Sequence, residues 1–325
     1  MIIVRSPLRI SLGGGGTDLP SYYKNSGGFL VAAAIDKYVY VTITKPFVPG
    51  IFLKYSDSEK VASVDKVKHN IIRETLRLRD YKNPQIEITT LSDIPAGTGL
   101  GSSGSFTTAL LKSLKAFDRM QASNYEIAEE ACHIEMNILK EPIGKQDQYI
   151  SSIGGITSFV FHKNDEVISA PLNLDDRTLN KLEDNLLLFF TGYSRSASQI
   201  LKDQNEKTLK NDDEMIKNLD YIKSIGFQSK NCLENGNLED FGRLMHEHWT
   251  YKKNRSTGMS NDQIDLWYSE GIKSGALGGK VVGAGGGGFL LFYTNDPEKL
   301  RLKMAKLNLE EVRFKFDFEG TKQII

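Results

Sequence analysis

The stretch Pro95-Ala-Gly-Thr-Gly-Leu-Gly-Ser-Ser-Gly-Ser105 separates two segments with different apolar periodicities. Residues 85–91 alternate apolar and polar side chains, as a strand does, and residues 106–117 repeat apolar side chains at helical spacing. The pattern therefore predicts a strand, a glycine-rich loop and a helix. Glycine permits φ > 0 and close approach to the backbone, and the first N–H groups of a helix are unpaired and lie at its positive end. A loop of this kind is suited to binding a polyphosphate.

This loop contains more glycine than a helix cap requires, so we favour phosphate binding over a capped turn without a ligand. Two hydroxyl groups stand where the helix is expected to begin, and each can cap the helix or reach a phosphate or its Mg²⁺. The residues concerned are Gly97, Gly99, Gly101, Gly104, Ser102 and Ser103.

Other nucleotide-binding motifs do not fit. Gly99-x-Gly101-x-x-Gly104 matches the dinucleotide fingerprint, but that motif needs an acidic residue at the end of a second parallel strand, and Asp118 follows a helical pattern instead. The Gly-Lys-Ser/Thr of a P-loop is absent from the sequence. A lone Asp240-Phe241-Gly242, without His-Arg-Asp, does not indicate a protein kinase.

Length and composition are those of a globular protein. The 325 residues suffice for two domains, and 41 Lys and Arg balance 41 Asp and Glu, so no net field favours nucleic acid or an acidic membrane. A small-molecule partner is expected. Cys132 and Cys232 give neither a disulfide framework nor metal-ligand spacing. The N-terminus has a strand pattern and no apolar run approaches the length of a membrane span, so we expect a cytoplasmic protein.

A second glycine cluster follows the first predicted strand. Residues 2–12 have a strand pattern and lead into four glycines, Thr17 and Asp18, which places a polar pair beside an approachable backbone. Taken alone, this segment is as compatible with a simple hairpin turn as with a binding site. In the hairpin interpretation, Arg9 is a solvated strand residue.

Two carboxylates can converge on one site. A capping box at Ser123-x-x-Glu126 opens a helix predicted over residues 124–139, with Glu135 near its end. Asp147 follows twelve residues later, in a loop beyond Pro142. Kinase chemistry uses one carboxylate to hold Mg²⁺ on the phosphates and another to accept or orient the proton of the attacking hydroxyl. The alternative is that both are exposed acids, the commonest location of Asp and Glu.

The remaining pattern predicts an α+β chain. Antiparallel strands mix with helices up to a hairpin over residues 157–170, and a domain boundary is expected near residue 175, in a polar stretch before the apolar strand 186–191. His246 and His248 lie two positions apart on a helix, so zinc binding is not expected. Further expected elements are helices 196–210, 212–234, 238–252 and 262–271, two strands around the glycines of 283–288, helix 297–307 and strand 312–318.

The loop at residues 95–103 resembles the second signature of the GHMP small-molecule kinases, Pro-x3-Gly-Leu-x-Ser-Ser. Pro7-x-Arg9 with Gly-Thr17-Asp18 resembles the first signature, and Gly283-Ala-Gly-Gly-Gly-Gly288 resembles the third, a loop that closes over the phosphate loop and the acceptor. The resemblance implies a two-domain α+β fold. Its N-terminal half, residues 1–175, is ribosomal S5 domain 2-like, and its C-terminal half, residues 176–325, is ferredoxin-like.

The same resemblance implies ATP and Mg²⁺ as cofactors and assigns roles to residues. Asp147 and Arg9 are the catalytic pair, and Ser103 and Glu135 hold the metal. The residues that bind the nucleotide are Pro95, Gly97, Thr98, Gly99, Leu100, Gly101, Ser102, Ser103 and Gly104. Those that bind the acceptor are Thr17, Asp18, Arg195, Gly285 and Gly286.

Several strings, among them Arg5-Ser-Pro-Leu-Arg-Ile-Ser11 and Thr191-Gly-Tyr-Ser-Arg-Ser-Ala197, resemble the D-glycero-D-manno-heptose 7-phosphate kinases; Leu12-Gly13 departs from the bulkier pair expected there. These enzymes phosphorylate the anomeric hydroxyl on the way to nucleotide-activated heptose. The acceptor implied is a sugar phosphate, with no nucleic acid or membrane partner, for a monomer or a homodimer. The alternatives are an L-fucose or galactose anomeric kinase, and an inactive sugar-binding regulator, against which the intact Ser103, Glu135 and Asp147 argue.

Overall fold

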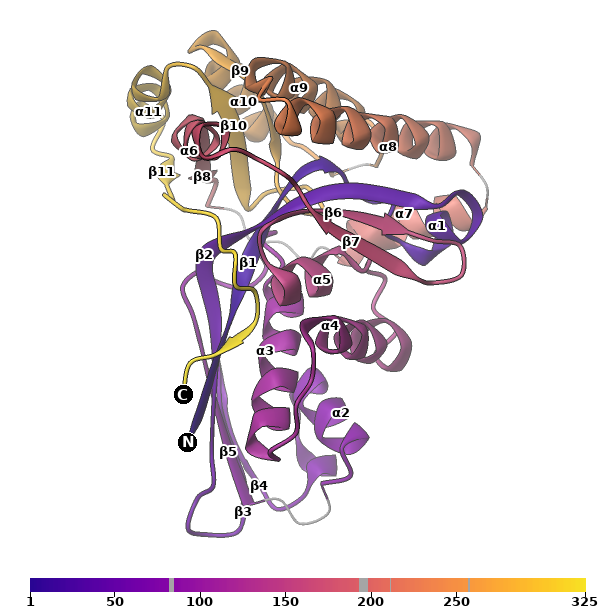
Figure 1. Cartoon of the computed structure of the whole chain (residues 1–325), viewed down its shortest axis with the longest axis vertical. Helices are drawn as coiled ribbons and strands as arrows, with labels where there is room; N and C mark the ends of the chain where they lie inside the picture. Colours follow the sequence, from indigo (N-terminus) through magenta and orange to yellow (C-terminus); the bar gives the residue numbers. More distant parts are fainter. Residues whose placement is uncertain (82–84, 193–197, 211, 257) are drawn as a thin grey trace.

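Two long antiparallel strands, β1 (Ile2–Gly14) and β2 (Gly28–Thr44), support the N-terminal half of the chain. The computed structural model describes residues 1–81, 85–192, 198–210, 212–256 and 258–325 (Figure 1). The strands belong to a sheet of order β12-β1-β2-β5-β3-β4, to which β6 and β7 are attached through β2. The other strands are β3 (Gly50–Lys54), β4 (Ser58–Val61), β5 (Gln85–Ser92), β6 (Ile156–Phe161), β7 (Val167–Pro171) and β12 (Lys322–Gln323).

Helices cover one face of this sheet in its lower part (Figure 1). The helix after the glycine loop, α3 (Ser102–Phe117), packs Ala109, Leu110 and Leu114 against β-branched residues of β2 and β5. The strand, glycine loop and helix predicted around residues 95–105 are therefore present. The remaining helices are α1 (Pro20–Ser26), η1 (Val64–Lys66), α2 (Asn70–Leu78), α4 (Asn124–Cys132), η2 (His133–Ile138) and α5 (Gln146–Ile153).

The C-terminal half contains a second, antiparallel sheet of order β11-β8-β10-β9. Numbered within this half, the order is 4-1-3-2 with helices between the strands, the ferredoxin-like arrangement predicted. Its strands are β8 (Leu186–Phe190), β9 (Ala276–Val281), β10 (Phe289–Thr294) and β11 (Glu310–Glu311). Its helices are α6 (Asp176–Asn185), α7 (Ser198–Leu209), α8 (Asp213–Glu234), α9 (Leu238–Lys253), α10 (Asp262–Lys273) and α11 (Pro297–Lys306).

The continuous apolar sequence of β8 and β10 follows from burial on both faces. Leu187 and Phe292 belong to a core shared with α9, α10 and α11, whereas Leu188 and Leu291 belong to a core shared with β1 and β2. Successive side chains of a strand point to opposite faces, so both sets are apolar. The two sheets thus share one hydrophobic core. The boundary near residue 175 stays a prediction.

The structure corrects four local expectations. The helix predicted over 124–139 is α-helical only to Cys132 and continues as the π-helix η2, a change that apolar spacing does not register. Asp147 was expected in a loop but lies in the first turn of α5. The polar stretch before β8 is mostly helix α6. The prediction of a strand over residues 312–318 is wrong. After β11 the chain returns to the first sheet, where Phe316 forms an isolated bridge with Ile35 and β12 pairs with β1.

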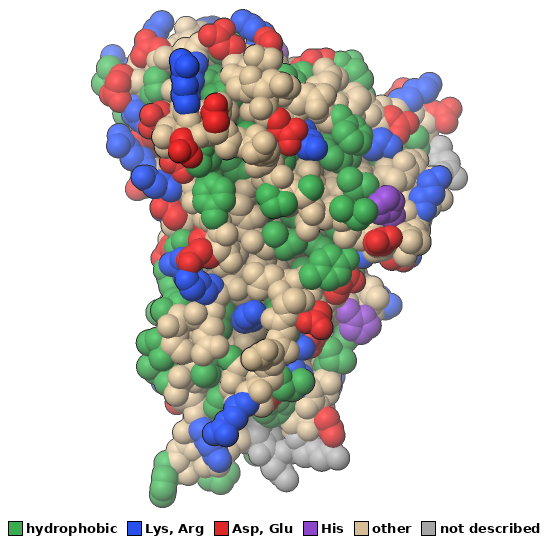
Figure 2. All heavy atoms as spheres, viewed as in Figure 1, with side chains coloured by type: hydrophobic (Ala, Val, Ile, Leu, Met, Phe, Trp, Pro, Cys, Tyr) green, Lys and Arg blue, Asp and Glu red, His purple; other side chains and the backbone are tan. Residues whose placement is uncertain are grey.

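The surface matches the balanced composition. Figure 2 shows acidic and basic side chains interspersed over the face in view. In the part of the chain that the structure describes, no helix combines the length and apolarity needed to cross a bilayer.

Candidate active site

A pocket of about 690 Å³ is lined by residues of both halves of the chain. The end of β1, the phosphate loop (residues 95–104), η2 and the start of α5 contribute from the first half, and α9, β9 and the C-terminal glycine loop (residues 283–288) contribute from the second. Among the predicted nucleotide-binding residues, the pocket is lined by Gly97, Gly99, Gly101, Ser102, Ser103 and Gly104.

The phosphate loop needs its glycines for conformation and for packing. Gly97, Gly99 and Gly101 have φ of 79°, 85° and 77°, values that side chains disfavour. A Cβ on Gly99 would lie 2.7 Å from the carbonyl oxygen of Val282, and one on Gly101 would lie 3.0 Å from Cγ of Arg9. The loop is thus in contact with the C-terminal glycine loop on one side and with Arg9 on another.

Three of the predicted nucleotide-binding residues support this loop and do not line the pocket. Leu100 is buried in the core, and its carbonyl accepts a hydrogen bond from the amide of Arg9 at 2.9 Å. The hydroxyl of Thr98 donates to the carbonyl of Pro95 at 3.0 Å. Helix α3 then begins after Gly101 without a side-chain cap, so its first N–H groups remain available to an anion.

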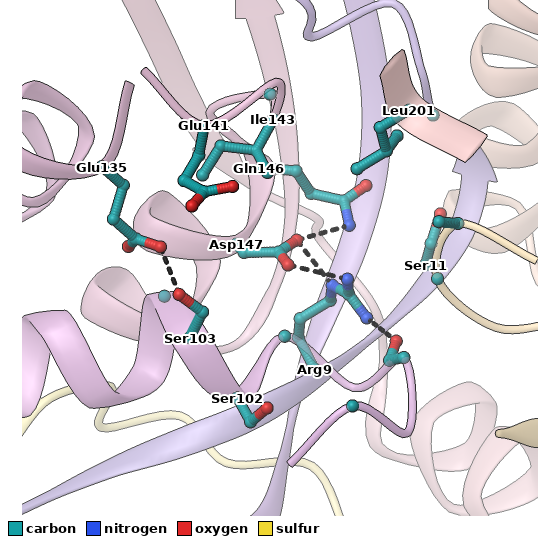
Figure 3. Close-up of a pocket in the computed structure, with 18 of the residues that line it drawn as sticks. Arg9, Ser11, Ser102, Ser103, Glu135, Glu141, Ile143, Gln146, Asp147 and Leu201 are labelled. Carbon is teal, nitrogen blue, oxygen red and sulfur yellow. Dashed lines mark hydrogen bonds and ion pairs between the residues drawn. The ribbon is translucent and has the colours of Figure 1, made fainter. Parts of the chain in front are cut away.

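Asp147 and Arg9 form a bidentate ion pair beside the start of α3. Nε of Arg9 donates to Oδ1 of Asp147 at 2.8 Å, and Nη2 donates to Oδ2 at 2.9 Å. The guanidinium also donates from Nη1 to the carbonyl of Gly99 (Figure 3). The Arg9 side chain is buried, whereas 31% of the Asp147 side chain is exposed, so the carboxylate is held by a fixed cation and remains open to the pocket.

Glu135 and Ser103 lie on the other side of Asp147 (Figure 3). The Ser103 hydroxyl donates to Oε2 of Glu135, and Nε2 of Gln148 donates to Oε1 at 3.0 Å. Burial raises the pKa of Glu135, although the hydrogen bonds from Ser103 and Gln148 oppose that shift. Glu135 sits in the π-helix η2, a distortion often found at functional sites. The two predicted carboxylates therefore do converge on one pocket.

The predicted acceptor residues are placed unequally. Asp18 lines the pocket, and its carboxylate accepts hydrogen bonds from the amides of Gly16 at 3.0 Å and Gln146 at 3.1 Å. Its pKa is raised, chiefly by burial. Thr17 is completely buried and uses its hydroxyl to pair with the backbone of Phe29, so it shapes the turn and does not line the pocket.

Of the two glycines predicted to bind the acceptor, one lines the pocket and the other does not. Gly285 lines the pocket, whereas the amide of Gly286 donates to the carbonyl of Met259 at 2.8 Å and so anchors the loop. Arg195 lies outside the described residues.

Sequence reasoning missed a group of basic residues from the C-terminal half, here called the basic cluster: Lys252, Arg255 and Lys280. All three are buried and line the pocket. Burial, reinforced by Arg255 and Arg9, lowers the pKa of Lys252 to about 7. The Lys252 ammonium donates to the carbonyls of Val281, at 3.0 Å, and Gly283. Because basic residues near a helix C-terminus are common, the sequence around Lys252 offered no distinct signal.

Two family models match the chain, one for the GHMP kinases N-terminal domain over residues 67–155 and one for the GHMP kinases C-terminal domain over residues 229–308. Together they cover more than half of the 325 residues. The chain belongs to the GHMP kinase family. This GHMP kinase is accordingly an ATP-dependent sugar kinase that transfers phosphate to an alcohol group, with ATP and Mg²⁺ as its cofactors.

Full-length relatives accompany the family match. The kinase is 29% identical to the D-glycero-alpha-D-manno-heptose 7-phosphate kinase of Campylobacter jejuni, covering 99% of this chain and 97% of the relative. It is 28% identical to the L-fucokinase/L-fucose-1-P guanylyltransferase of Bacteroides fragilis, covering 90% of this chain but 34% of that protein. A D-glycero-D-manno-heptose 1-phosphate kinase structure from Bacteroides thetaiotaomicron matches with a TM-score of 0.80 at 26% identity, covering 100% and 99% of the two chains.

The pocket of this GHMP kinase suits Mg·ATP. Gly97, Gly99 and Gly101 adopt positive φ that other residues would strain to reach, and free helix N–H groups lie next to them. Ser103 and Glu135 offer the hard oxygen atoms that Mg²⁺ prefers. Among the described residues, no group of three or more His, Cys, Asp or Glu side chains is arranged so that it could hold a metal ion by itself. That donor set suits an ion held by one carboxylate and by substrate phosphates.

Proposed function

We propose that this kinase phosphorylates the anomeric hydroxyl of D-glycero-D-manno-heptose 7-phosphate to give the 1,7-bisphosphate, a step toward nucleotide-activated heptose in the cytoplasm. The similarity to the Campylobacter jejuni kinase, which extends over 99% of this chain, supports the choice of substrate. The observation that carries the chemistry is the convergence of Asp147 and Glu135 on one pocket at the start of α3.

In this proposal the ATP phosphates lie along the phosphate loop, where the first N–H groups of α3 donate to them. Ser103 and Glu135 would hold Mg²⁺, and the ion would supply positive charge against the phosphates of ATP. Nε2 of Gln148 donates to Oε1 of Glu135, and the Ser103 hydroxyl donates to Oε2, so the orientation of the carboxylate is fixed. These residues bind and orient the donor.

Asp147 acts on the acceptor. Its carboxylate accepts a hydrogen bond from the anomeric hydroxyl and orients that oxygen toward the γ-phosphorus. The new sugar O–P bond forms as the bond to the β-phosphate oxygen breaks, ADP leaves, and the hydroxyl proton is released through Asp147 or directly to water. Arg9 fixes the orientation of Asp147 and supplies positive charge close to the transferring phosphoryl group.

Other residues of the pocket, next to the Asp147–Arg9 pair, would hold the sugar. Asp18, which has free carboxylate lone pairs and lines the pocket, accepts a hydrogen bond from a ring hydroxyl. Gly285 lines the acceptor side, while Thr17 and Gly286 hold their two turns in shape. Arg195, from its sequence context after Thr191-Gly192, contacts the phosphate already present on the substrate.

An L-fucose anomeric kinase is the second candidate, because 90% of the chain aligns with the L-fucokinase/guanylyltransferase of Bacteroides fragilis at 28% identity. That protein carries a further activity in its name, and this chain spans about a third of it. Identity to the Pyrococcus furiosus galactokinase is lower, at 24%.

A sugar panel tests the proposal. The purified kinase is assayed with Mg·ATP and heptose 7-phosphate, L-fucose, galactose or mevalonate, and ³¹P NMR identifies the position phosphorylated. We expect the highest kcat/KM with heptose 7-phosphate and a product phosphorylated at the anomeric carbon. Preferred use of fucose or galactose would refute the substrate, and absence of ATP turnover with every acceptor would favour an inactive regulator.

A further inference from the structure

Among the described residues, the basic cluster has no carboxylate in direct ion-pair contact, unlike most buried cations. Arg255, Lys252 and Lys280 are 7%, 8% and 1% exposed. Charged groups are rarely buried without a partner because desolvation is costly. Nevertheless, within the described ranges none of the three forms an ion pair with a carboxylate. A missing anion would account for this arrangement.

Arg255 has the clearest unused donor. Its Nε donates to Oδ1 of Asn218 at 3.1 Å and its Nη1 donates to Oε1 of Gln204 at 3.1 Å. Its Nη2 is buried, and no described residue accepts a hydrogen bond from it. Burial lowers the pKa of Arg255 to about 10, so the side chain is still a cation at neutral pH. Its hydrogen-bond partners are neutral amides. The Asp18 carboxylate opposes the effect of burial on this pKa, but it forms no ion pair with the guanidinium.

Each of the two lysines has hydrogen-bond partners, but neither forms an ion pair with a carboxylate of the described residues. Lys252 donates to two backbone carbonyls, and Lys280 lies 3.2 Å from Nδ1 of His248. Burial lowers the pKa of Lys280, with Lys252 and Arg9 acting in the same direction. The pKa of His248 is also lowered, first by burial and then by Lys280. An anion bound here would stabilise the charged forms of both amines.

Arg255 lies next to the part of the pocket where the sugar acceptor is proposed to bind. Its Nη1 lies so close to Gly16 that a Cβ there would clash with it, and Gln204 donates to the Gly16 carbonyl at 2.9 Å. The amide of Gly16 in turn donates to Asp18, the proposed ring-hydroxyl partner. The phosphate loop, Ser103 and Glu135 supply a separate set of contacts for the phosphates of ATP. Arg255 is therefore adjacent to the sugar side of the pocket.

We infer that Arg255, assisted by Lys252 and Lys280, forms an anion subsite that binds the phosphate already carried by the sugar acceptor. The inference rests on the proposed function, because it names the part of the pocket that distinguishes a sugar phosphate from a free sugar. Arginine suits this role, since its planar fork presents several donors to phosphate oxygens. A free hexose offers only hydroxyls and would leave the cluster uncompensated.

The test compares two acceptors that differ only in the phosphate: heptose 7-phosphate and the same heptose without it. For Arg255→Gln we expect KM for heptose 7-phosphate to rise by about 10- to 100-fold, the size of a lost hydrogen bond to a charged group. The KM for ATP should not rise, and kcat/KM for the free heptose should fall much less than kcat/KM for heptose 7-phosphate. The matched control is Lys253→Gln, since Lys253 is exposed at the end of α9, two residues before Arg255, and pairs with Asp265.

The outcomes separate the two proposals. If the wild-type kinase does not use heptose 7-phosphate, the proposed function fails. If it does, but Arg255→Gln affects both acceptors equally or changes only KM for ATP, the subsite is wrong and the proposed function stands. Should Arg255→Gln not fold, as judged by circular dichroism, inorganic phosphate provides the test with the wild-type protein. Inhibition competitive with heptose 7-phosphate but not with ATP supports the subsite, and inhibition competitive only with ATP overturns it.

Discussion

Buried charge faces the pocket from both halves of the chain, but the two groups differ in how they are compensated. In the N-terminal half, Arg9 and Asp147 neutralise each other through two hydrogen bonds of 2.8 and 2.9 Å. In the C-terminal half, the basic cluster has carbonyls, amides and a histidine as hydrogen-bond partners, and among the described residues it forms no ion pair with a carboxylate.

The Arg9–Asp147 pair is therefore fully paired before a ligand binds. The basic cluster, in contrast, would gain its counter-ion only when a ligand binds. A preorganised carboxylate needs a fixed partner, because orientation determines its effect in the transition state. An anion subsite needs unused positive charge, because a paired cation has less to offer an incoming phosphate. Removing a member of each group should therefore affect different kinetic constants.

The largest effect is expected at the Asp147–Arg9 pair. Asp147→Asn should lower kcat by about 10²- to 10⁴-fold with little change in KM, because the carboxylate acts on the hydroxyl mainly in the transition state. Steady-state kinetics with both substrates measures this. Asp213→Asn, which alters an exposed acid in the first turn of α8, is the control. An Asp147→Asn enzyme with a near wild-type rate would reject this role.

The metal site should show the next largest effect. Ser103→Ala and Glu135→Gln should each raise the Mg²⁺ concentration needed for half-maximal turnover by about 10- to 100-fold, since each removes an oxygen atom positioned for the ion. A Mg²⁺ titration at saturating sugar checks this. Unchanged titration curves in both variants would mean that the ion is held elsewhere.

A substitution of Arg195 tests whether the phosphate of the sugar acceptor also contacts the segment after β8. Arg195→Ala should raise KM for heptose 7-phosphate by about 10-fold and leave KM for ATP unchanged, as expected for one lost hydrogen bond to a phosphate. Combining it with Arg255→Gln sharpens the comparison. Non-additive effects would indicate a shared phosphate, whereas an Arg195→Ala enzyme with wild-type KM would remove Arg195 from the subsite.

The smallest effect concerns stability rather than turnover. Lys252 has a pKa of about 7 in the folded chain, below its ordinary value of 10.5, so the unfolded state binds more protons between those pH values. The free energy of unfolding should therefore rise with pH in that window, by at most about 1.4 kcal/mol per pH unit from this group. Below pH 7 both states are protonated and the contribution stays at its minimum.

Urea denaturation of the ligand-free protein from pH 7 to pH 10 measures this slope. Lys252→Met should have a smaller slope than the wild type, and Lys253→Met, which changes the exposed neighbour, should not. Equal slopes in the wild type and in Lys252→Met would show that Lys252 remains protonated when buried.

The sequence alone determined the parts of this protein that depend on neighbouring residues. Alternation before Pro95 and helical spacing after Ser105 specified β5, the phosphate loop and α3, because strand and helix periodicities are local properties. The three motifs identified the family that the domain models confirm. The first motif contains Arg9, and the sequence also offered Glu135 and Asp147, outside the motifs, as a pair of carboxylates able to converge.

Tertiary structure decided what depends on distant residues meeting. The π-helical turn at Glu135 and the helical position of Asp147 involve shifts of a residue or two that apolar spacing does not record. The return of the chain end to β1 depends on pairing between residues more than 300 positions apart. The basic cluster was invisible for the same reason. Whether a lysine or arginine is solvated or buried without a counter-ion depends on which helices and loops cover it, and only the packed fold of both halves determines that.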